Sequence, residues 1–379
     1  DALGYQGDPK DQKVCKEILG QLTSAQKGTA LRDHFKSPPY GWPQDAVDGS
    51  LMVLSRAGEL RVQLNGVYAL PSQVTQDRLG KFTFAREHTV VTASHRLQLR
   101  KLVTDAGVSC KSGEEPEALA RFLAALLALG EKAGGAAPRP PVPNLTAVTS
   151  IESLSGNERL LAACEHKDEL AALWTDWEAR AKKIEVRMAE WERLQGLMQR
   201  GASLDDAEDA AKQAQAISDD RTLLVDPNPL SSLVASMTDA LRQAVRASVE
   251  RYTKALDHGM NQLRTAPEFA AVSADTWAGV IQACQLQAPP ELRLGTEAEV
   301  IAAVESMPLS TLSDRVDALQ GRLAKARQLL ASAVAPKAVS YSPPQRLIKS
   351  AEEAEAYVGE IRDALLKAID AGNPVNVGR

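Results

Sequence analysis

Residues 43–70 read PQDAVDGSLMVLSRAGELRVQLNGVYAL, and their periodicity changes at Gly58. Before Gly58, apolar residues recur at helical spacing behind Pro43, a residue favoured at the start of a helix. Gly58 itself suits a helix C-terminus. After it, apolar and polar residues alternate over 60–64, and the Asn-Gly pair at 65–66 is a favoured two-residue hairpin turn. The stretch therefore predicts a helix that is followed by a β-hairpin.

Two further helices are expected upstream of this stretch. Apolar residues at helical spacing predict one over 9–20, and Leu31 with Phe35 predicts another that ends at Pro38-Pro39. Three helices followed by a hairpin is the order of a winged helix, although any small α+β domain can show the same pattern. We expect a winged-helix-like domain over 1–75.

A basic stretch follows, inside an expected α/β extension over 76–132. Its cations are Lys81, Arg86, Arg96, Arg100 and Lys101; against the single acid Glu87, five minus one leaves a local charge of +4. Clustered cations can bind phosphates, which makes these five residues candidate DNA contacts. The alternative is that they neutralise carboxylates such as Glu114, Glu115 and those of 205–209.

A Pro- and Gly-rich segment over 133–150 has the composition of a linker, and the region after it, 151–379, is helical in pattern. Two segments have apolar residues that recur at two positions of a seven-residue repeat. We call these rows heptad seams, and they predict coiled-coil-like helices. The first seam holds Trp177, Ile184, Trp191 and Met198, with Trp174, Ala181 and Met188 beside it; the second runs through Leu309, Leu312, Val316, Leu319, Leu323, Ala326 and Leu330. A third amphipathic helix spans 233–256. We expect an elongated helical bundle or arm, with a compact helical domain as the alternative.

Composition places the chain among mainly α proteins. Aromatic residues make up only 4% of the 379 residues, and Ala and Leu recur throughout. A net charge of −5 argues against a surface that binds nucleic acid everywhere. Four cysteines without a CxxC pair, no membrane-spanning stretch and no signal-peptide pattern indicate an excised piece of a cytoplasmic protein.

Motifs that carry chemistry are missing from the sequence. It contains no phosphate-cradling GxxxxGK[ST], no GxGxxG, no HExxH and no GxSxG. Cys164 and His166 are close in sequence, but two neighbouring metal ligands without a second pair are usually a coincidence. We assign no catalytic, cofactor-binding or metal-binding residue, and we expect no enzyme activity.

Residues 31–66 carry the most distinctive run: LRDHF, then PPYGWPQDAVDG, a Leu-rich helix and Gly58-Glu59-Leu60. This run resembles a signature of the large P-loop ATPases of BREX (bacteriophage exclusion) systems, the BrxC and PglY family, near their C-terminal part. In that family the nucleotide-binding motifs lie upstream of the signature, so ATP and Mg are implied only for that upstream region. The resemblance implies a role in phage exclusion and the associated host DNA methylation within a multi-subunit complex. It transfers no catalytic residue.

The resemblance also implies other BREX subunits as partners, and no membrane. A recognition helix starting at Pro43 would present carboxylates that oppose a phosphate backbone, so protein docking is the favoured role. Trp42 is interpreted either as a core anchor or as an exposed docking aromatic. The candidate docking residues are Tyr40, Trp42, Gln44, Asp45 and Asp48. Self-association through the helical seams and sequence-independent DNA binding through 81–101 are the further partners considered.

Overall fold

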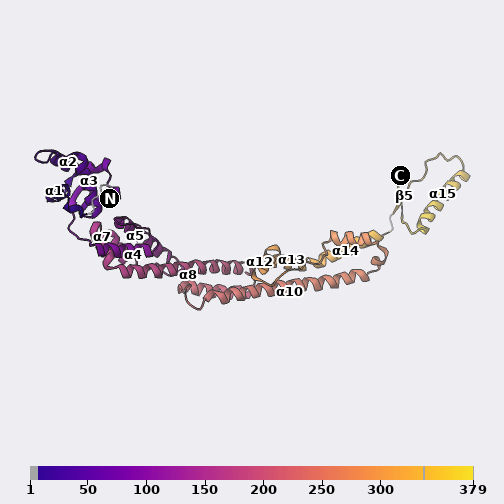
Figure 1. Cartoon of the computed structure of the whole chain (residues 1–379). Helices are drawn as coiled ribbons and strands as arrows, with labels where there is room; N and C mark the ends of the chain where they lie inside the picture. The colour runs from indigo at the N-terminus through magenta and orange to yellow at the C-terminus, as the bar shows by residue number, and fades with distance from the viewer. Residues whose placement is uncertain (1–6, 336–337, 379) are drawn as a thin grey trace. The chain divides into compact units, whose positions relative to one another are not determined.

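The computed structural model describes residues 7–335 and 338–378, and it divides into two compact units. Unit 1 comprises Asp1–Leu194 and Ala211–Leu233, and unit 2 comprises Gln195–Ala210 and Val234–Arg379. The described elements are mainly helices, many of them labelled in Figure 1, with a small antiparallel sheet near the N-terminus. The expected mainly α fold is confirmed. None of the described helices is long and apolar enough to cross a bilayer.

The N-terminal part of unit 1 has winged-helix order. Its elements are α1 (Lys13–Gln21), β1 (Gln26–Lys27), α2 (Gly28–Lys36), α3 (Gln44–Ala57), β2 (Leu60–Leu64), β3 (Val67–Tyr68) and β4 (Thr83–Arg86). The antiparallel sheet has the order β1-β4-β2-β3, so the short strand between the first two helices pairs with the last strand. Since β4 completes this sheet, the domain extends past residue 75, where the sequence placed its boundary.

Helix α3 forms as its pattern predicts. Val47, Leu51 and Leu54 are at most 1% exposed and meet the core residues of α1, α2 and the sheet. Gly58 ends the helix with φ +78°, a left-handed conformation that glycine adopts without a Cβ penalty. The predicted Asn-Gly turn joins β2 to β3.

The segment between β3 and β4, which corresponds to the wing, lies on α2. It holds two short 3-10 helices, η2 (Pro71–Gln73) and η3 (Gln76–Lys81), and its Leu79 is fully buried. The Gly28 N–H donates to the Phe82 carbonyl over 2.9 Å. A Cβ on Gly28 would lie 2.1 Å from the Leu79 carbonyl oxygen, so only glycine fits under this segment. The wing is therefore packed onto its own domain.

The rest of unit 1 is helical. It contains α4 (Ala93–Asp105), α5 (Glu115–Lys132), α6 (Thr146–Ser153), α7 (Gly156–Glu165), the larger part of α8 (Lys167–Arg200) and residues 211–219 of α9 (Asp205–Asp219). Helices α4 to α7 contact one another around a core that includes Leu99, Phe122 and Trp177. Residues 94–103, which fall in the expected α/β extension over 76–132, belong to α4.

The predicted linker over 133–150 lies inside unit 1. Ala133, Pro138 and Pro140 are buried, and the Gly135 N–H donates to the Pro140 carbonyl over 2.9 Å. Prolines and glycines in this segment form a packed turn rather than a spacer between domains, because their side chains and backbone find partners within the unit.

The first heptad seam lies on α8. Trp177, Ile184 and Trp191 are buried, with exposed fractions of 2%, 4% and 8%. The parallel row of Trp174, Ala181 and Met188 is half-buried.

On the same helix, Lys183 and Arg187 bind Asp226 at 2.6 and 3.2 Å, which joins the turn before α10 to α8. The hydrogen bond from Lys183 lowers the pKa of the Asp226 carboxyl.

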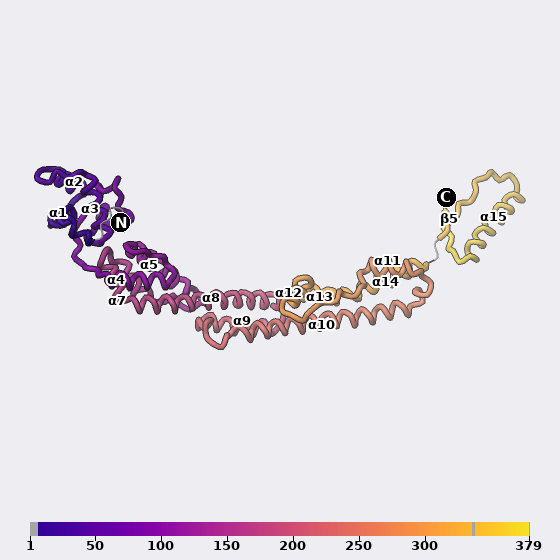
Figure 2. The backbone as a smooth tube through the Cα atoms, viewed as in Figure 1, coloured from indigo at the N-terminus to yellow at the C-terminus, as the bar shows by residue number. Residues whose placement is uncertain are grey.

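Unit 2 is built on most of α10 (Pro229–Thr265). Its other elements are η4 (Pro267–Ala271), α11 (Ala274–Ala283), α12 (Glu297–Ser306), α13 (Leu309–Asp317), α14 (Leu319–Val334), β5 (Val339–Tyr341), α15 (Ala351–Asp370) and β6 (Val375–Val377). Figure 2 shows α11 and α14 beside the later turns of α10. A Cβ on Gly259 would lie 2.2 Å from Leu323, so glycine lets α10 and α14 approach closely.

The second seam is divided between two helices. Ala318 separates α13 from α14, and the buried members of the seam are Leu312, Leu319, Leu323, Ala326 and Leu330. Leu309 and Val316 are half-buried. The seam thus packs within unit 2. After it, β5 and β6 form a two-stranded parallel sheet, which the helical pattern of 151–379 did not predict.

Candidate functional site

An aromatic corner surrounds the docking residues Tyr40 and Trp42. The Trp42 ring stacks on the buried Phe35 with centroids 5.2 Å apart and an interplanar angle of 8°. The Tyr40 ring lies 5.0 Å from Trp42, and its hydroxyl donates to Glu17 over 3.4 Å. Both side chains are half-buried. Trp42 therefore combines features of both interpretations: it packs on the core and keeps part of its ring at the surface.

Replacing Trp42 by Ala should lower the free energy of unfolding by about 1–2 kcal/mol. This is less than the roughly 3–5 kcal/mol typical of a fully buried aromatic, because the ring is only half-buried. Urea titration followed by far-UV circular dichroism measures the loss. Val53→Ala is the matched control on the exposed face of α3, where 43% exposure makes the expected change small. A loss near 4 kcal/mol would identify Trp42 as a core anchor only.

Asp48 is not a docking residue. Its carboxylate is 1% exposed and accepts hydrogen bonds from Nε and Nη2 of Arg32 at 2.7 and 2.8 Å. The Gln44 amide donates to the same carboxylate over 3.2 Å. The prediction placed Asp48 on an exposed face because it considered α3 alone, whereas this face of α3 packs against α2. The sequence did not identify Arg32 as the partner of Asp48, because it showed only that Arg32 is a cation in the preceding helix.

Asp45 and Gln44 do remain exposed, at the first turn of α3. The Gln76 amide of the wing donates to Asp45 over 3.1 Å, and the Gln76 carbonyl accepts from Arg32 over 3.1 Å. The wing is therefore hydrogen-bonded to both α2 and the first turn of the helix that would read DNA in a winged-helix protein.

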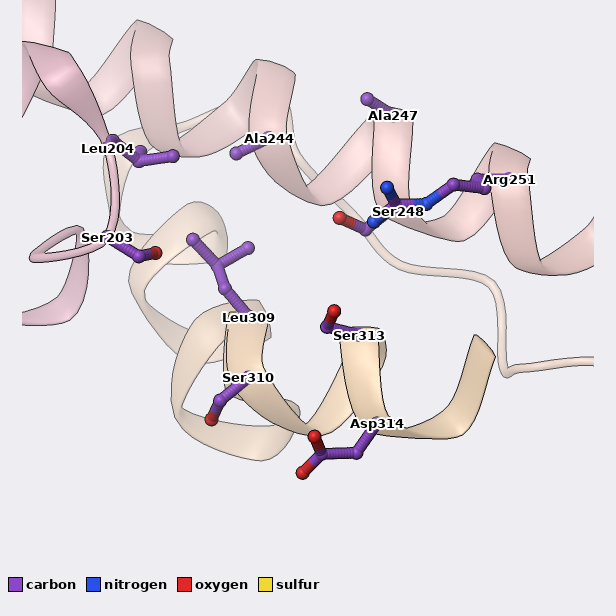
Figure 3. A pocket seen from close by; sticks show the side chains of 10 residues that line it. All are labelled: Ser203, Leu204, Ala244, Ala247, Ser248, Arg251, Leu309, Ser310, Ser313 and Asp314. Atoms are coloured by element: carbon purple, nitrogen blue, oxygen red, sulfur yellow. The ribbon is translucent and has the colours of Figure 1, made fainter. Parts of the chain in front are cut away.

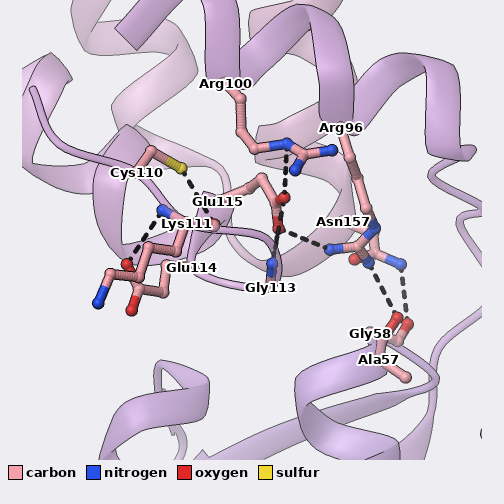
Figure 4. A network of polar contacts seen from close by, with 10 residues as sticks. All are labelled: Ala57, Gly58, Arg96, Arg100, Cys110, Lys111, Gly113, Glu114, Glu115 and Asn157. Atoms are coloured by element: carbon pink, nitrogen blue, oxygen red, sulfur yellow. Dashed lines mark hydrogen bonds and ion pairs between the residues drawn. The ribbon is translucent and has the colours of Figure 1, made fainter. Parts of the chain in front are cut away.

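Two of the five candidate DNA cations are bound inside unit 1 (Figure 4). Arg96 Nη1 and Arg100 Nε lie 3.3 Å from the two oxygens of Glu115, which is 1% exposed. The Gly113 N–H donates to the same carboxylate over 3.0 Å. The Arg100 contact lacks hydrogen-bond geometry and is electrostatic. Both cations are thus engaged by the buried Glu115 charge, which is the alternative that the sequence left open, and their assignment to DNA stays a prediction.

The same cluster caps the end of α3. Arg96 Nη2 donates to the Ala57 carbonyl over 2.9 Å, and the Asn157 amide donates to the carbonyls of Gly58 and Thr89 at 2.9 and 2.7 Å. Carbonyls at a helix C-terminus have no partner within the helix, and these side chains supply one. We call Arg96, Arg100, Glu115 and Asn157 the polar latch. It joins the winged-helix-like part to α4, α5 and α7, and sequence reasoning missed it.

The hairpin side of the domain is bound as well. Arg61 donates to the Ser155 hydroxyl over 2.6 Å, and the Ser72 N–H donates to Glu117 over 2.8 Å. Burial, followed by the negative charges of Glu117 and Glu87, raises the pKa of the Tyr68 hydroxyl to about 12. The β2-β3 hairpin thus faces the helical part of unit 1.

Tyr68 makes the stability of unit 1 depend on pH in the alkaline range. Its pKa is raised from an ordinary value of 10.0, so its contribution is fully present below pH 10 and is lost as pH rises toward 12. A shift of this size corresponds to at most about 2.7 kcal/mol. Thermal unfolding between pH 9 and 12 should show a steeper loss for the wild type than for Tyr68→Phe. Parallel pH profiles would contradict the buried position of the hydroxyl.

The remaining candidate cations, Lys81, Arg86 and Lys101, are exposed. They lie on different elements: the end of η3, the end of β4 and the middle of α4. A hydrogen bond with the Thr75 side chain lowers the pKa of Asp77, and the positive charge of nearby Lys81 lowers it further. The basic stretch is therefore three surface cations rather than a patch of five.

A pocket in unit 2 lies between α10 and α13 (Figure 3). Its lining consists mainly of small and hydroxyl side chains, including Ser203, Ser248, Ser310 and Ser313. Arg251 and Asp314, the charged members of this lining, are both exposed. The pocket offers hydroxyls and small apolar surfaces, without a desolvated reactive group.

Family models, curated proteins and solved structures yield no match to this chain. Within residues 7–335 and 338–378, no three His, Cys, Asp or Glu side chains gather where they could hold a metal ion.

Proposed function

We propose that this chain is a non-catalytic assembly region of a BREX-type anti-phage defence ATPase, connecting an ATPase core to partner subunits. The resemblance of 31–66 to the BrxC and PglY signature motivates the family assignment. The observation that supports an assembly role is that the wing of the winged-helix-like domain is hydrogen-bonded to α2 and to the first turn of α3.

Contacts of Gln76, Asp48 and Glu115 support this role. The wing is hydrogen-bonded to α2 and to the first turn of α3 through Gln76. The buried Asp48 neutralises Arg32, and the buried Glu115 neutralises Arg96 and Arg100. DNA binding depends on cations that are free to reach phosphates. Three arginines of unit 1 are engaged by buried carboxylates, and its half-buried aromatic corner offers a surface for a protein partner.

The test is a pull-down of the chain with each other BREX subunit, beside duplex DNA at matched salt. We expect one subunit to be retained, and we expect the double change Tyr40→Ala and Asp45→Lys to weaken that retention. Val53→Ala, on the exposed face of the same domain, is the control that should leave it unchanged. Retention of DNA in place of every subunit would contradict the proposal.

DNA binding remains the second candidate, because Lys81, Arg86 and Lys101 are exposed. If all three reach phosphates, log affinity should fall with log salt at a slope of about −2.7, since each contact contributes about 0.9. The triple change Lys81→Glu, Arg86→Glu, Lys101→Glu should then abolish binding at low salt. Reversing Arg96 or Arg100 would not be informative, because it would place additional carboxylates beside Glu115.

A further inference from the structure

The pocket between α10 and α13 leaves two helices of unit 2 incompletely packed against each other. It has a volume of about 630 Å³, and residues 203–204, in the turn before α9, also line it. All of the lining belongs to unit 2. Closely packed helices leave few voids larger than a water molecule, whereas sites for small molecules typically have volumes of about 300–1,000 Å³. The pocket therefore has the size of a binding site.

One wall of the pocket is apolar. Leu204 and Leu309 contribute branched side chains that are half-buried, and Ala244 and Ala247 of α10 contribute methyl groups. Figure 3 shows Leu309 pointing from α13 toward α10. A hydrocarbon group placed against this wall would complete the burial of both leucines and remove their apolar surface from water. The wall therefore suits the hydrocarbon part of a ligand.

The other end of the pocket carries a cation and hydroxyl groups. Ser248 and Arg251 lie on the same face of α10 as Ala244, because they follow it by four and seven residues. Ser313 lies on the side of α13 that faces α10 (Figure 3). Neither hydroxyl makes a hydrogen bond within the described chain. A guanidinium and hydroxyl groups are donors that bind carboxylates and phosphates, so this end suits an oxyanion.

The charge of Arg251 is not neutralised by the carboxylates around it. Arg251 forms no ion pair with any described carboxylate, and Glu250, the acid next to it on α10, binds Lys254 at 2.6 Å. Asp314 lines the same pocket, but Figure 3 shows its side chain on the side of α13 that faces away from α10. An oxyanion in the pocket would therefore meet a guanidinium whose hydrogen-bond donors are available.

We propose that this pocket binds a small amphipathic anion, a molecule that carries a carboxylate or phosphate group on a hydrocarbon body. The oxyanion accepts hydrogen bonds from Arg251, Ser248 and Ser313, while the hydrocarbon covers Leu204 and Leu309. One bound molecule thereby fills the space between α10 and α13. This site goes beyond the proposed assembly role and does not depend on it.

Isothermal titration calorimetry of the whole chain tests this inference with octyl phosphate and with octanoate, each below the concentration at which it forms micelles. We expect saturable binding of at least one of them, and the two titrations distinguish a phosphate site from a carboxylate site. Octanol lacks the oxyanion and inorganic phosphate lacks the hydrocarbon, so each should bind at least about tenfold more weakly. Absence of saturable binding by both octyl anions would overturn the proposal, as would equal binding of either control compound.

A substitution at Arg251 locates the site. Arg251→Gln changes an exposed residue, so the far-UV circular dichroism spectrum should be retained while the affinity for the octyl anion falls at least about tenfold. Arg246→Gln is the matched control and should leave the affinity unchanged, because Arg246 is an exposed arginine on the same helix that does not line this pocket. Equal affinities of the two variants would show that the anion binds elsewhere and would overturn the assignment.

Discussion

Replacing Glu115 by Ala is expected to lower the free energy of unfolding of unit 1 by about 3 kcal/mol. Removing one partner of a buried ion pair typically costs about 3–5 kcal/mol, because the other charge stays without compensation. The lower end applies here, since the side chains of Arg96 and Arg100 keep 18% and 31% of their surface exposed. The Gly113 N–H would also lose its acceptor. Urea titration followed by far-UV circular dichroism measures the change.

Glu114 provides the matched control for this prediction. It precedes Glu115 and is exposed, and its carboxylate accepts the Lys111 N–H over 3.1 Å. Glu114→Ala should therefore cost less than about 1 kcal/mol. Hydrogen exchange adds a local measurement, because loss of the polar latch should speed exchange at the C-terminal end of α3. Equal effects of the two substitutions would show that Glu115 does not hold the latch.

Elements with strong local patterns were predictable from the sequence. Helix α3 is one, since its apolar face and Gly58 define its body and its end. The Asn-Gly turn is another, because few residues other than glycine and asparagine tolerate the positive φ that it needs; here the two φ values are +51° and +82°. The first seam of α8 followed from its period of seven. In each case the information lies within a few neighbouring residues.

The polar latch was not predictable, because its partners are distant in sequence. Asn157 caps a carbonyl at Gly58, 99 residues away, and Arg96 meets Glu115 across 19 residues. A charge count can detect the cations but cannot determine which carboxylate faces them. The same limit explains Asp48, whose exposure depends on where α2 packs. It also explains the buried prolines of 133–150, because composition alone does not distinguish a packed turn from a linker.

The βαβ unit formed by β5, α15 and β6 was missed for a different reason. Val339–Tyr341 and Val375–Val377 are three residues each, too short to show alternation, while the 20 residues of α15 dominate the pattern around them. A parallel pair of strands also gives no turn signal, because its strands are joined by a crossover rather than by a hairpin. Helical periodicity therefore predicted the helix and hid the strands.

Replacing Trp177 by Ala should lower the free energy of unfolding by about 3–5 kcal/mol, the range for a large buried aromatic. Trp177 is 2% exposed and belongs to the core that joins α8 to α4, α5 and α7. Val186→Ala on the same helix, at 61% exposure, should change stability by less than about 0.5 kcal/mol. Comparable losses for the two would show that the seam does not pack where the period places it.

A second substitution, at Gly130, tests the contact between Gly130 and the Trp177 ring. A Cβ on Gly130 would lie 2.8 Å from the Trp177 ring and 2.5 Å from Leu145, so Gly130→Ala should destabilise the wild type even though Ala favours helices by about 1 kcal/mol. In the Trp177→Ala background the ring is gone and the same change should cost less. Urea titrations of the wild type and the three variants form a double-mutant cycle, and the double variant should lose about 1 kcal/mol or more less than the sum of the two single changes. Strict additivity would mean that the ring does not lie against Gly130.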